Sequence, residues 1–511
     1  FTMLCKVGLT LALLLATASA ARPGVGFFSA PTHPTQEYPE MLDDEPLILS
    51  HLPPHEARAA SKVSGAGLDN GTSSYAGFFV TQKETNNSMF FWFFEAQEPK
   101  VANPPLLIWL QGGPGGSSMF ALFSEMGPYE LVQDGKAYAA RRRETTWNKE
   151  YSMLFIDNPV GAGFSFTTTD AGYCTDTKEC VSRNLYSLLQ QFYTVFPEQL
   201  KSPLYVTGES YGGHYVPGIS YYIHTHNKAI AEGTAQGVKI PLAGLAVGDG
   251  WIDPVNMIPA YPAMMFNQGL IDDEQRVVIQ KMCDESVANI KAGKMSAAFD
   301  VWDRMLNGDI WPYGNLFHNY TGLNDYDNYM NTNAPASFGF YPEFLNQANA
   351  RAALHVGAAK FPSNPRECEM HLVSDFMASF RDELSVLLDN YKVLIYSGQL
   401  DVIIGAALTE RFLPNVQWRG QAKYNAAPRA VWRINDKDTE VAGCDHTHTQ
   451  THALTRSHAH TLNHMHSTTN TCRHILTTSR ALTQDVKGTS TTLNPRCTFT
   501  HPRTHTQTLS A

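Results

Sequence analysis

The chain has 511 residues, of which 43% are hydrophobic and 17% are charged, and its formal net charge is −10. This composition is sufficient for a large buried core in one domain that carries an insertion. No run of Lys or Arg indicates binding to nucleic acid or to an anionic lipid surface, so neither partner is expected. The oligomeric state stays open.

Residues 1–20 have the pattern of a secretory signal peptide. Lys6 precedes an apolar stretch over residues 9–16, and the segment ends in Ala-Ser-Ala, an A-x-A cleavage sequence. The apolar stretch is too short for a membrane-spanning helix, so no stable membrane anchor is expected. Residues 21–60 follow as an N-terminal or pro-segment, of which residues 31–54 are proline-rich and acidic and are expected to be loose. The expected destination is the secretory pathway, either outside the cell or in a lysosome.

Apolar runs alternate with helix-like stretches over residues 61–250, which is typical of a mostly parallel sheet covered by helices. One run, residues 105–110, indicates a buried strand and leads into Gln-Gly-Gly-Pro-Gly-Gly-Ser-Ser at residues 111–118. This loop lacks the Lys-Ser/Thr ending and the G-x-G-x-x-G spacing of phosphate-binding loops. It is suited to present a backbone N–H, that of Gly113, to an oxyanion, although a tight turn without chemistry is the alternative.

The most informative motif is Gly-Glu-Ser-Tyr-Gly at residues 208–212. It lies between an apolar, strand-like run at residues 204–206 and a helix-like stretch, which is the context of a nucleophile elbow. In such an elbow the serine occupies a sharp turn, and flanking glycines allow the strained backbone. Ser210 is therefore a candidate nucleophile, and the N–H of Tyr211 is a second candidate oxyanion donor.

The pattern changes at residues 251–346. Residues 271–306 carry apolar side chains at helical spacing, and residues 307–337 are rich in Asn, Tyr, Asp and Gly. This stretch is predicted to be a helical cap inserted above the strand ends, where it would narrow a cleft. Residues 347–443 would complete the core, with a strand near residues 391–397 and a loop that carries Asp401. The order of serine before aspartate is that of a hydrolase.

Residues 444–511 are composed mainly of Thr, His, Ser and Asn, with one aromatic residue. Because they show no periodic apolar pattern, they are predicted to be disordered and to add nothing to the core. A His-rich tract can bind metal, but the spacing has no regular ligand pattern, so neither a metal site nor a cofactor is expected. Alternating Thr-His is also what a translated CA dinucleotide repeat encodes.

Four cysteines remain in the predicted core and cap: Cys174, Cys180, Cys283 and Cys368. They allow three pairings, of which Cys174 with Cys180 and Cys283 with Cys368 is the simplest, because the first pair closes a short loop. Acceptor sequences for N-glycosylation begin at Asn70, Asn86 and Asn319 and agree with a secretory route.

Several motifs in one order resemble the serine carboxypeptidase family, most closely its vitellogenic carboxypeptidase-like branch, from about residue 46 to residue 443. Most of that family has Asn and Cys where this chain has Gln111 and Gly116, whereas the vitellogenic-like branch is similar to this chain at both positions. The resemblance implies an α/β-hydrolase fold. The motifs that carry it are Tyr75-Ala76-Gly77-Phe78, Phe90-Phe91-Trp92-Phe93-Phe94, residues 109–118, Ile156-Asp157-Asn158-Pro159-Val160-Gly161-Ala162-Gly163-Phe164-Ser165, residues 208–212, Tyr215-Val216-Pro217, Gly248-Asp249-Gly250 and residues 396–401.

The resemblance also implies a function, the removal of C-terminal residues from peptides or proteins at acid pH through an acyl-enzyme. Ser210 would be the nucleophile, Gly113 and Tyr211 the oxyanion donors, and Asp401 the acid that orients the catalytic histidine. Two neighbouring carboxyls cannot both ionise easily, so one of them can donate a proton to the carboxylate of the substrate. The residues implied in binding that carboxylate are Trp109, Gln111, Gly112, Glu125 and Glu209.

The general base is missing from this pattern. In the family it lies roughly sixty residues after the catalytic aspartate, in a Gly-Gly-His stretch followed by a proline, but here the resemblance ends at Gly443. His458 and His460 lie near that distance without a glycine-rich strand end, and His214, His355 and His371 precede Asp401 and are expected to be structural or surface residues. Two alternatives follow: an active carboxypeptidase whose last segment is corrupted in this sequence, or an inactive relative that binds peptide C-termini or a partner protein.

Overall fold

The first described segment packs against the rest of the fold. The computed structural model describes residues 45–69, 72–308, 310, 314–363, 365–435, 437–447 and 474–477, all within one compact unit of residues 1–479. The predicted signal peptide lies outside the described residues. Leu49 and Ala57 are buried, and the N–H of Phe78 donates to the carbonyl oxygen of Leu47 at 3.0 Å. The prediction of a loose segment is therefore wrong for residues 45–54, because their apolar side chains join the core.

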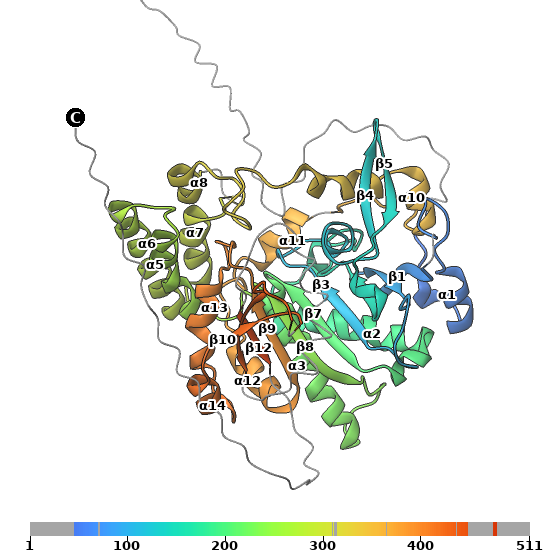
Figure 1. Ribbon diagram of the computed structural model, residues 1–511. Coiled ribbons are helices and arrows are strands. Elements are labelled where there is room, and N and C mark those ends of the chain that lie inside the picture. The colour runs from blue at the N-terminus through green and yellow to red at the C-terminus, as the bar shows by residue number, and fades with distance from the viewer. Residues whose placement is uncertain are drawn as a thin grey trace, which may run out of the picture. The chain divides into compact units, whose positions relative to one another are not determined.

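A ten-stranded sheet organises the fold, in the order β1-β2-β6-β3-β7-β8-β9-β12-β11-β10 (Figure 1). Its central strands β6, β3, β7, β8 and β9 are parallel, whereas β1, β2 and β6 pair antiparallel. The prediction of a mostly parallel central sheet is confirmed, and the fold is that of an α/β-hydrolase. The strands are β1 (Ser74–Gln82), β2 (Asn87–Phe94), β3 (Leu106–Leu110), β6 (Ser152–Ile156), β7 (Leu204–Glu209), β8 (Leu242–Gly248), β9 (Lys392–Ser397), β10 (Ala430–Trp432), β11 (Gly443–Thr447), β12 (His474–Thr477) and a separate hairpin of β4 (Tyr129–Asp134) and β5 (Ala137–Arg142).

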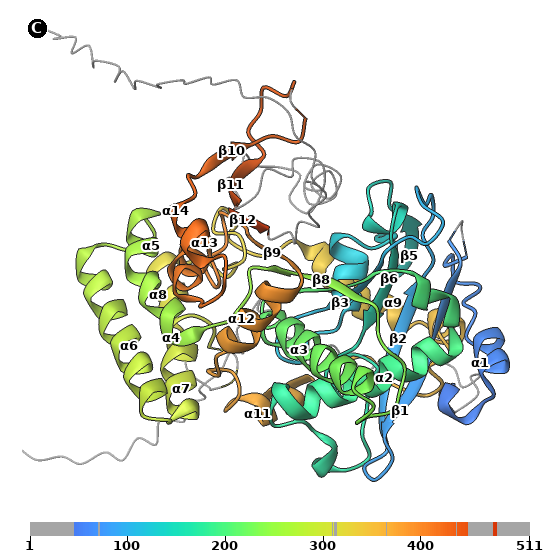
Figure 2. The same ribbon diagram turned by 90° about the horizontal axis from the view of Figure 1, so that it is seen from below.

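The two faces of the sheet carry separate hydrophobic cores. In β2, Phe91 and Phe93 belong to one core and Phe90, Trp92 and Phe94 to the other, because successive side chains of a strand point to opposite faces. Helices α2, α3 and α12 lie side by side on the first face (Figure 2). The helices of this layer and of the C-terminal half are α1 (Pro54–Ala60), α2 (Ser182–Val195), α3 (Gly212–Ala231), α10 (Ala348–Ala353), α11 (Pro365–Leu372), α12 (Arg381–Asn390), α13 (Ala406–Phe412) and α14 (Gln421–Ala426).

Helices follow one another between β8 and β9, where the sequence predicts the cap. The longest begins at a capping box in which Asp272 and Gln275 exchange hydrogen bonds, and its buried residues Ile279, Cys283 and Ser286 lie on one face. Among the described residues no helix is long and apolar enough to cross a membrane. The helices are α4 (Pro254–Met257), α5 (Tyr261–Asn267), α6 (Asp273–Lys291), α7 (Met295–Met305), α8 (Leu316–Thr321) and α9 (Phe340–Leu345).

Two segments of the predicted disordered tail belong to the sheet. Strand β12 pairs antiparallel with β9, with His474 opposite Ser397, and β11 pairs parallel with β12. The prediction of disorder is therefore wrong at these residues. The physical reason is that the open edge of β9 offers backbone hydrogen bonds to any extended segment, whatever its side chains. The remainder of residues 444–511 lies outside the described residues.

One of the two expected disulfides is present. Cys174 and Cys180 are bonded, with 5.4 Å between their Cα atoms, so that pairing is confirmed. The pairing of Cys283 with Cys368 is wrong, because both are buried outside any disulfide. Cys283 lies 3.7 Å from the sulfur of Met305 in the inserted helices, whereas Cys368 packs on the glycine loop beside Gly115.

Candidate active site

Ser210 occupies the turn between β7 and α3. Its φ angle is +57°, in the left-handed region that costs energy for a residue with a side chain. Hydrogen bonds to the next strand hold this backbone: the Ser210 N–H donates to Gly248 at 3.1 Å, and the Trp251 N–H donates to the Ser210 carbonyl oxygen at 2.9 Å. The neighbouring glycine is required by close packing, because a Cβ at Gly208 would lie 2.3 Å from the carbonyl oxygen of Leu110.

The glycine loop after β3 touches the elbow directly. A Cβ at Gly112 would lie 2.6 Å from both the Ser210 Cβ and the Tyr211 nitrogen, so only glycine fits there. Gly113, with a φ angle of +126°, follows at once. Ser118 fixes the loop by donating to the Ile156 carbonyl oxygen at 2.6 Å. The structure thus packs the glycine loop directly against Ser210 and the backbone nitrogen of Tyr211.

A chain of hydrogen bonds runs beside the elbow. The indole N–H of Trp109 donates to Gln111 Oε1 at 2.8 Å, and Gln111 Nε2 donates to Glu209 Oε1 at 2.8 Å. Trp109 and Gln111 are both buried. Because the indole N–H is already used, Trp109 orients the Gln111 amide, and the amide in turn fixes the Glu209 carboxylate next to Ser210.

Glu125 completes this chain from the helical turn Ala121–Glu125. Burial raises its pKa well above the usual value, and the nearby Glu209 carboxyl raises it further. Burial also raises the pKa of Glu209, although hydrogen bonds from Glu125 and Gln111 oppose that rise. The charge of Arg143 lowers the Glu125 pKa, but less than burial and Glu209 raise it.

Asp401 lies in the loop after β9, at the same edge of the sheet as Ser210. It is buried, and both its carboxylate oxygens lie 3.2 Å from the N–H of Ile404. Burial raises its pKa well above the usual value, and the charges of Asp249 and Asp327 raise it further. Among the described side chains no histidine donates to this carboxylate.

The inserted segment contacts the Asp401 loop. The Val402 N–H donates to Tyr326 at 2.8 Å and the Tyr329 N–H donates to Leu400 at 3.1 Å. Asp327 lies between these two bonds, and burial raises its pKa well above the usual value, as do the charges of Asp325, Glu209 and Asp249. The carboxyls of both loops therefore face a common acidic region.

The histidines before Asp401 have structural positions. His214 is fully buried against the rings of Tyr211 and Phe380, with its Nδ1 3.6 Å from Asp375 Oδ2. His355 Nε2 lies 3.1 Å from the carbonyl oxygen of Lys62. Neither makes a hydrogen bond with Ser210 or Asp401.

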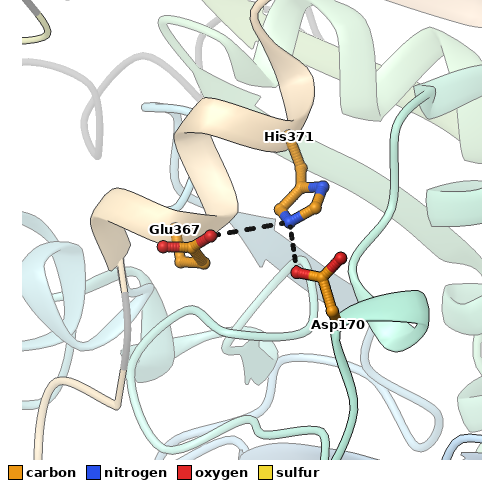
Figure 3. Close-up of side chains that lie close together, drawn as sticks. All are labelled: Asp170, Glu367 and His371. Atoms are coloured by element: carbon orange, nitrogen blue, oxygen red, sulfur yellow. Dashed lines mark hydrogen bonds and ion pairs between the residues drawn. The ribbon is translucent and has the colours of Figure 1, made fainter.

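His371 forms a surface cluster with two acids (Figure 3). Its Nε2 lies 3.2 Å from Asp170 and 3.7 Å from Glu367, and its ring stacks on Tyr173. The three ligand atoms lie within 4.8 Å of one another, but both carboxylates are exposed. Ion pairs are sufficient to explain the cluster, which tethers α11 to the turn Asp170–Gly172.

Sequence reasoning missed several buried acids around the site. Asp157 accepts hydrogen bonds from Ser117 at 2.5 Å and from the N–H of Phe164 at 2.8 Å, so it braces the glycine loop. Asp249 belongs to the motif Gly248-Asp249-Gly250, and no sequence pattern indicates Asp375. The one usable signal was an aspartate beside glycine in an apolar stretch, as in Gly248-Asp249-Gly250.

Comparison with known proteins agrees with this geometry. Residues 67–479 match the serine carboxypeptidase family. A probable serine carboxypeptidase CPVL of Mus musculus is 44% identical over 371 residues, which cover 72% of this chain and 75% of that protein. The venom serine carboxypeptidase of Apis mellifera is 39% identical over 81% of this chain and 87% of its own length. The vitellogenic carboxypeptidase of Aedes aegypti is 35% identical over 78% of this chain and 82% of its own length.

A solved structure shares the fold. The structure of Kex1Δp, a prohormone-processing carboxypeptidase from Saccharomyces cerevisiae, superposes with a TM-score of 0.64 at 23% identity and covers 77% of this chain and 89% of that one. The sequence match spans most of the chain, and the glycine loop packs directly on the turn that carries Ser210. On these grounds the chain belongs to the serine carboxypeptidase family.

Proposed function

We propose that this site binds the C-terminal residue of a peptide or protein and holds its free carboxylate beside Ser210. The Gln111 amide and the Gly112 backbone would donate to that carboxylate, and Trp109 would orient Gln111. The protonated member of the Glu125 and Glu209 pair would supply a further donor. The observation that carries the proposal is the unbroken hydrogen-bonded chain from Trp109 to Glu209, which ends next to the nucleophile.

The acid pair makes binding depend on pH. With its raised pKa, Glu125 stays protonated and neutral under mildly acid conditions. When it ionises at higher pH, two negative carboxylates would face the carboxylate of the substrate. We therefore propose that the site works in acid, and that the burial of the pair sets this range.

The reaction itself would be acyl transfer. Ser210 Oγ would attack the carbonyl carbon of the last peptide bond, and the N–H groups of Gly113 and Tyr211 would stabilise the oxyanion. The acyl-enzyme would then be hydrolysed by water. The inserted segment over the Asp401 loop would close the cleft beyond the carboxylate and so limit cleavage to one residue from the chain end.

The base that should take the serine proton has no counterpart among the described side chains. Where a histidine should meet Asp401, the described neighbours are backbone N–H groups and further acids. We propose that the chain as given binds peptides but turns them over at a negligible rate. A transcript covering the region after Gly443 separates the alternatives, because a Gly-Gly-His ending would mean an active enzyme and the His-Thr ending an inactive binder.

The binding part of the proposal has a direct test. Calorimetry at pH 5 should detect a blocked dipeptide with a free C-terminal carboxylate and should show at least tenfold weaker binding of its C-terminal amide. Gln111→Ala should remove most of that preference, whereas exchanging the exposed Gln133 for Ala should not. Equal affinity for acid and amide would refute the carboxylate site.

The destination follows from the same features. The disulfide between Cys174 and Cys180 suits an oxidising compartment, and Asn86 and Asn319 are exposed, as glycosylation requires. Asn70 lies outside the described residues. We propose a secreted or lysosomal glycoprotein whose partners are peptide C-termini, with neither nucleic acid nor a membrane anchor involved.

A further inference from the structure

A buried carboxylate lies behind the oxyanion loop on the side away from the substrate. Asp375 Oδ2 accepts a hydrogen bond from the Tyr211 hydroxyl at 2.6 Å and another from the Thr177 hydroxyl at 2.6 Å. Tyr211 is 1% and Asp375 7% exposed. The backbone N–H of Tyr211 is the second donor of the proposed oxyanion site. Asp375 therefore holds the side chain of the residue whose backbone would stabilise the oxyanion.

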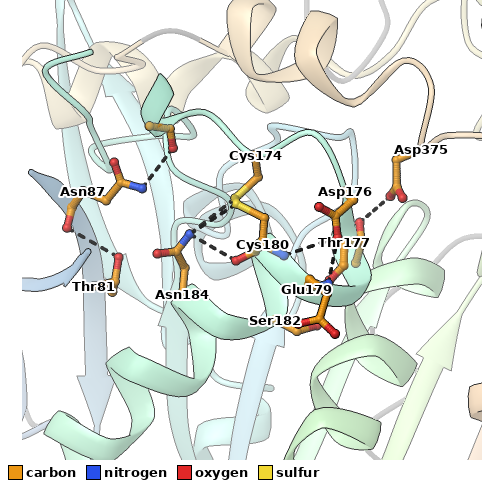
Figure 4. Close-up of a disulfide and its surroundings, with 11 residues drawn as sticks. Thr81, Asn87, Cys174, Asp176, Thr177, Glu179, Cys180, Ser182, Asn184 and Asp375 are labelled. Atoms are coloured by element: carbon orange, nitrogen blue, oxygen red, sulfur yellow. Dashed lines mark hydrogen bonds between the residues drawn. A yellow bond between two sulfur atoms is a disulfide. The ribbon is translucent and has the colours of Figure 1, made fainter. Parts of the chain in front are cut away.

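Thr177, the second donor to Asp375, is itself anchored. Thr177 opens the turn Thr177–Val181, within the short loop that the Cys174–Cys180 disulfide closes (Figure 4). The carboxylate of Asp176 caps that turn by accepting the Glu179 N–H at 2.8 Å. Thr177 therefore has little freedom to leave Asp375.

The segment that carries Asp375 is docked on the short stretch of chain that follows β8. The indole N–H of Trp251 donates to Phe376 at 2.8 Å, and the Phe380 N–H donates to Ile252 at 2.9 Å. The Trp251 N–H also donates to Ser210. Asp375 and the nucleophile are thus held by the same short piece of chain.

Charge favours this arrangement at acid pH. Burial alone would raise the pKa of Asp375, but the hydrogen bond and charge of His214, and then the hydrogen bonds from Thr177 and Tyr211, lower the pKa below its usual value, so Asp375 stays ionised. Burial raises the Tyr211 pKa well above its usual value, so its hydroxyl keeps the proton that it donates. Burial lowers the pKa of His214, whereas Asp375 raises it. An ionised acceptor makes the bond from the Tyr211 hydroxyl strong, because charge-assisted hydrogen bonds are roughly twice as strong as neutral ones.

We propose that Asp375 is a positioning residue, which fixes the Tyr211 backbone so that its N–H points at the oxyanion. The proposal deepens the proposed function and rests on it, because it assumes that this N–H acts on the scissile carbonyl oxygen. Without the bond, the Tyr211 ring would keep its packing against Phe376 and His214 but would lose the one directional contact that sets its rotation.

Two ligands that share the carboxylate site isolate this effect. One is a blocked dipeptide, and the other is its phosphinic analogue, in which a tetrahedral, negatively charged phosphinate replaces the scissile amide. Only the analogue places a charged oxygen against the Gly113 and Tyr211 N–H groups. Calorimetry on the full chain at pH 5 gives both affinities without any need for turnover.

Asp375→Asn and Tyr211→Phe should each weaken the analogue about tenfold, or roughly 1.4 kcal/mol, and change dipeptide affinity less than twofold. The double variant should be no worse than either single variant. Tyr193→Phe is the matched control, because the buried Tyr193 hydroxyl has no hydrogen-bond partner among the described residues, and it should change neither affinity.

The proposal is overturned if Asp375→Asn weakens both ligands equally or neither. If the unaltered chain binds neither ligand, the proposed function fails. Amide hydrogen exchange then tests separately whether Asp375 fixes the Tyr211 backbone. Faster exchange over residues 208–213 in Asp375→Asn, with Tyr193→Phe unchanged, supports the positioning role. Unchanged exchange there refutes it.

Discussion

Replacing Asp157 by asparagine should change how stability depends on pH. Asp157 is fully buried behind the glycine loop, and burial raises its pKa from 3.8 to about 7. The hydrogen bonds that it accepts from Ser117 and from the N–H of Phe164 lower this pKa, but burial outweighs them. Asparagine has nearly the same shape as a protonated aspartic acid and carries no charge, so Asp157→Asn imitates the neutral acid.

The size of the effect follows from the two pKa values. A pKa of about 7 in the folded state against 3.8 in the unfolded state corresponds to roughly 4 kcal/mol. Because the folded state binds the proton more tightly, this contribution is fully present below pH 3.8 and is lost as the pH rises through 7. Between pH 5 and pH 8 the free energy of unfolding of the unaltered protein should fall by roughly 3 kcal/mol more than that of Asp157→Asn.

Urea unfolding at four or five pH values measures this difference. Other carboxyls with raised pKa values, such as Glu125 and Asp401, affect both proteins equally and cancel in the comparison. If the difference in unfolding free energy between the two proteins stays constant across pH within about 0.5 kcal/mol, Asp157 is not neutral in the folded protein. If the unaltered protein instead gains stability relative to Asp157→Asn at high pH, Asp157 is ionised in the folded state.

Two further predictions concern the site itself. Glu125→Gln should abolish the fall in affinity for a carboxylate-ended dipeptide as the pH rises, because the raised pKa of Glu125 is the cause of that fall. Calorimetry between pH 4.5 and 7.5 tests this. An unchanged pH profile in the variant would exclude a role of the acid pair in binding the carboxylate. Gly112→Ala should cost about 1–3 kcal/mol of stability through overpacking, since its Cβ would lie 2.6 Å from Ser210 Cβ. It should also abolish binding of the phosphinic analogue. Gly314→Ala should do neither, because its Cβ would only make ordinary contact with the Asn319 side chain at 3.8 Å. Normal analogue binding by Gly112→Ala would mean that the loop stands away from Ser210.

Local patterns predicted the parts of the fold that local physics determines. The strand before the glycine loop, the strand before Ser210 and the strand before Asp401 are short apolar runs ended by turn residues, and each is present as β3, β7 and β9. The elbow could be recognised because its glycines are required by backbone contacts with neighbouring strands, which leave no choice of residue.

Features that depend on long-range packing could not be predicted in the same way. The second cysteine pairing failed because α6 and α11 pack against different parts of the fold, which the number of cysteines cannot reveal. The tail strand β12 carries no strand signal, since it is selected by the open edge of β9. No local pattern identifies Asp375, because the two residues that donate hydrogen bonds to it, Tyr211 and Thr177, are 164 and 198 residues away in the sequence.

The measurement that tests the central claim most directly is turnover and labelling by the chain as given. The claim is that a complete nucleophile and oxyanion site lacks its base, and loss of a triad histidine costs roughly a million-fold in kcat. Residues 21–511, challenged at acid pH with a blocked dipeptide and a serine-reactive phosphonate, should bind the dipeptide without releasing its C-terminal residue and should not be labelled stoichiometrically. Turnover or labelling that disappears in Ser210→Ala would contradict the claim. If that activity were also lost in His474→Ala, β12 would be identified as the source of the base.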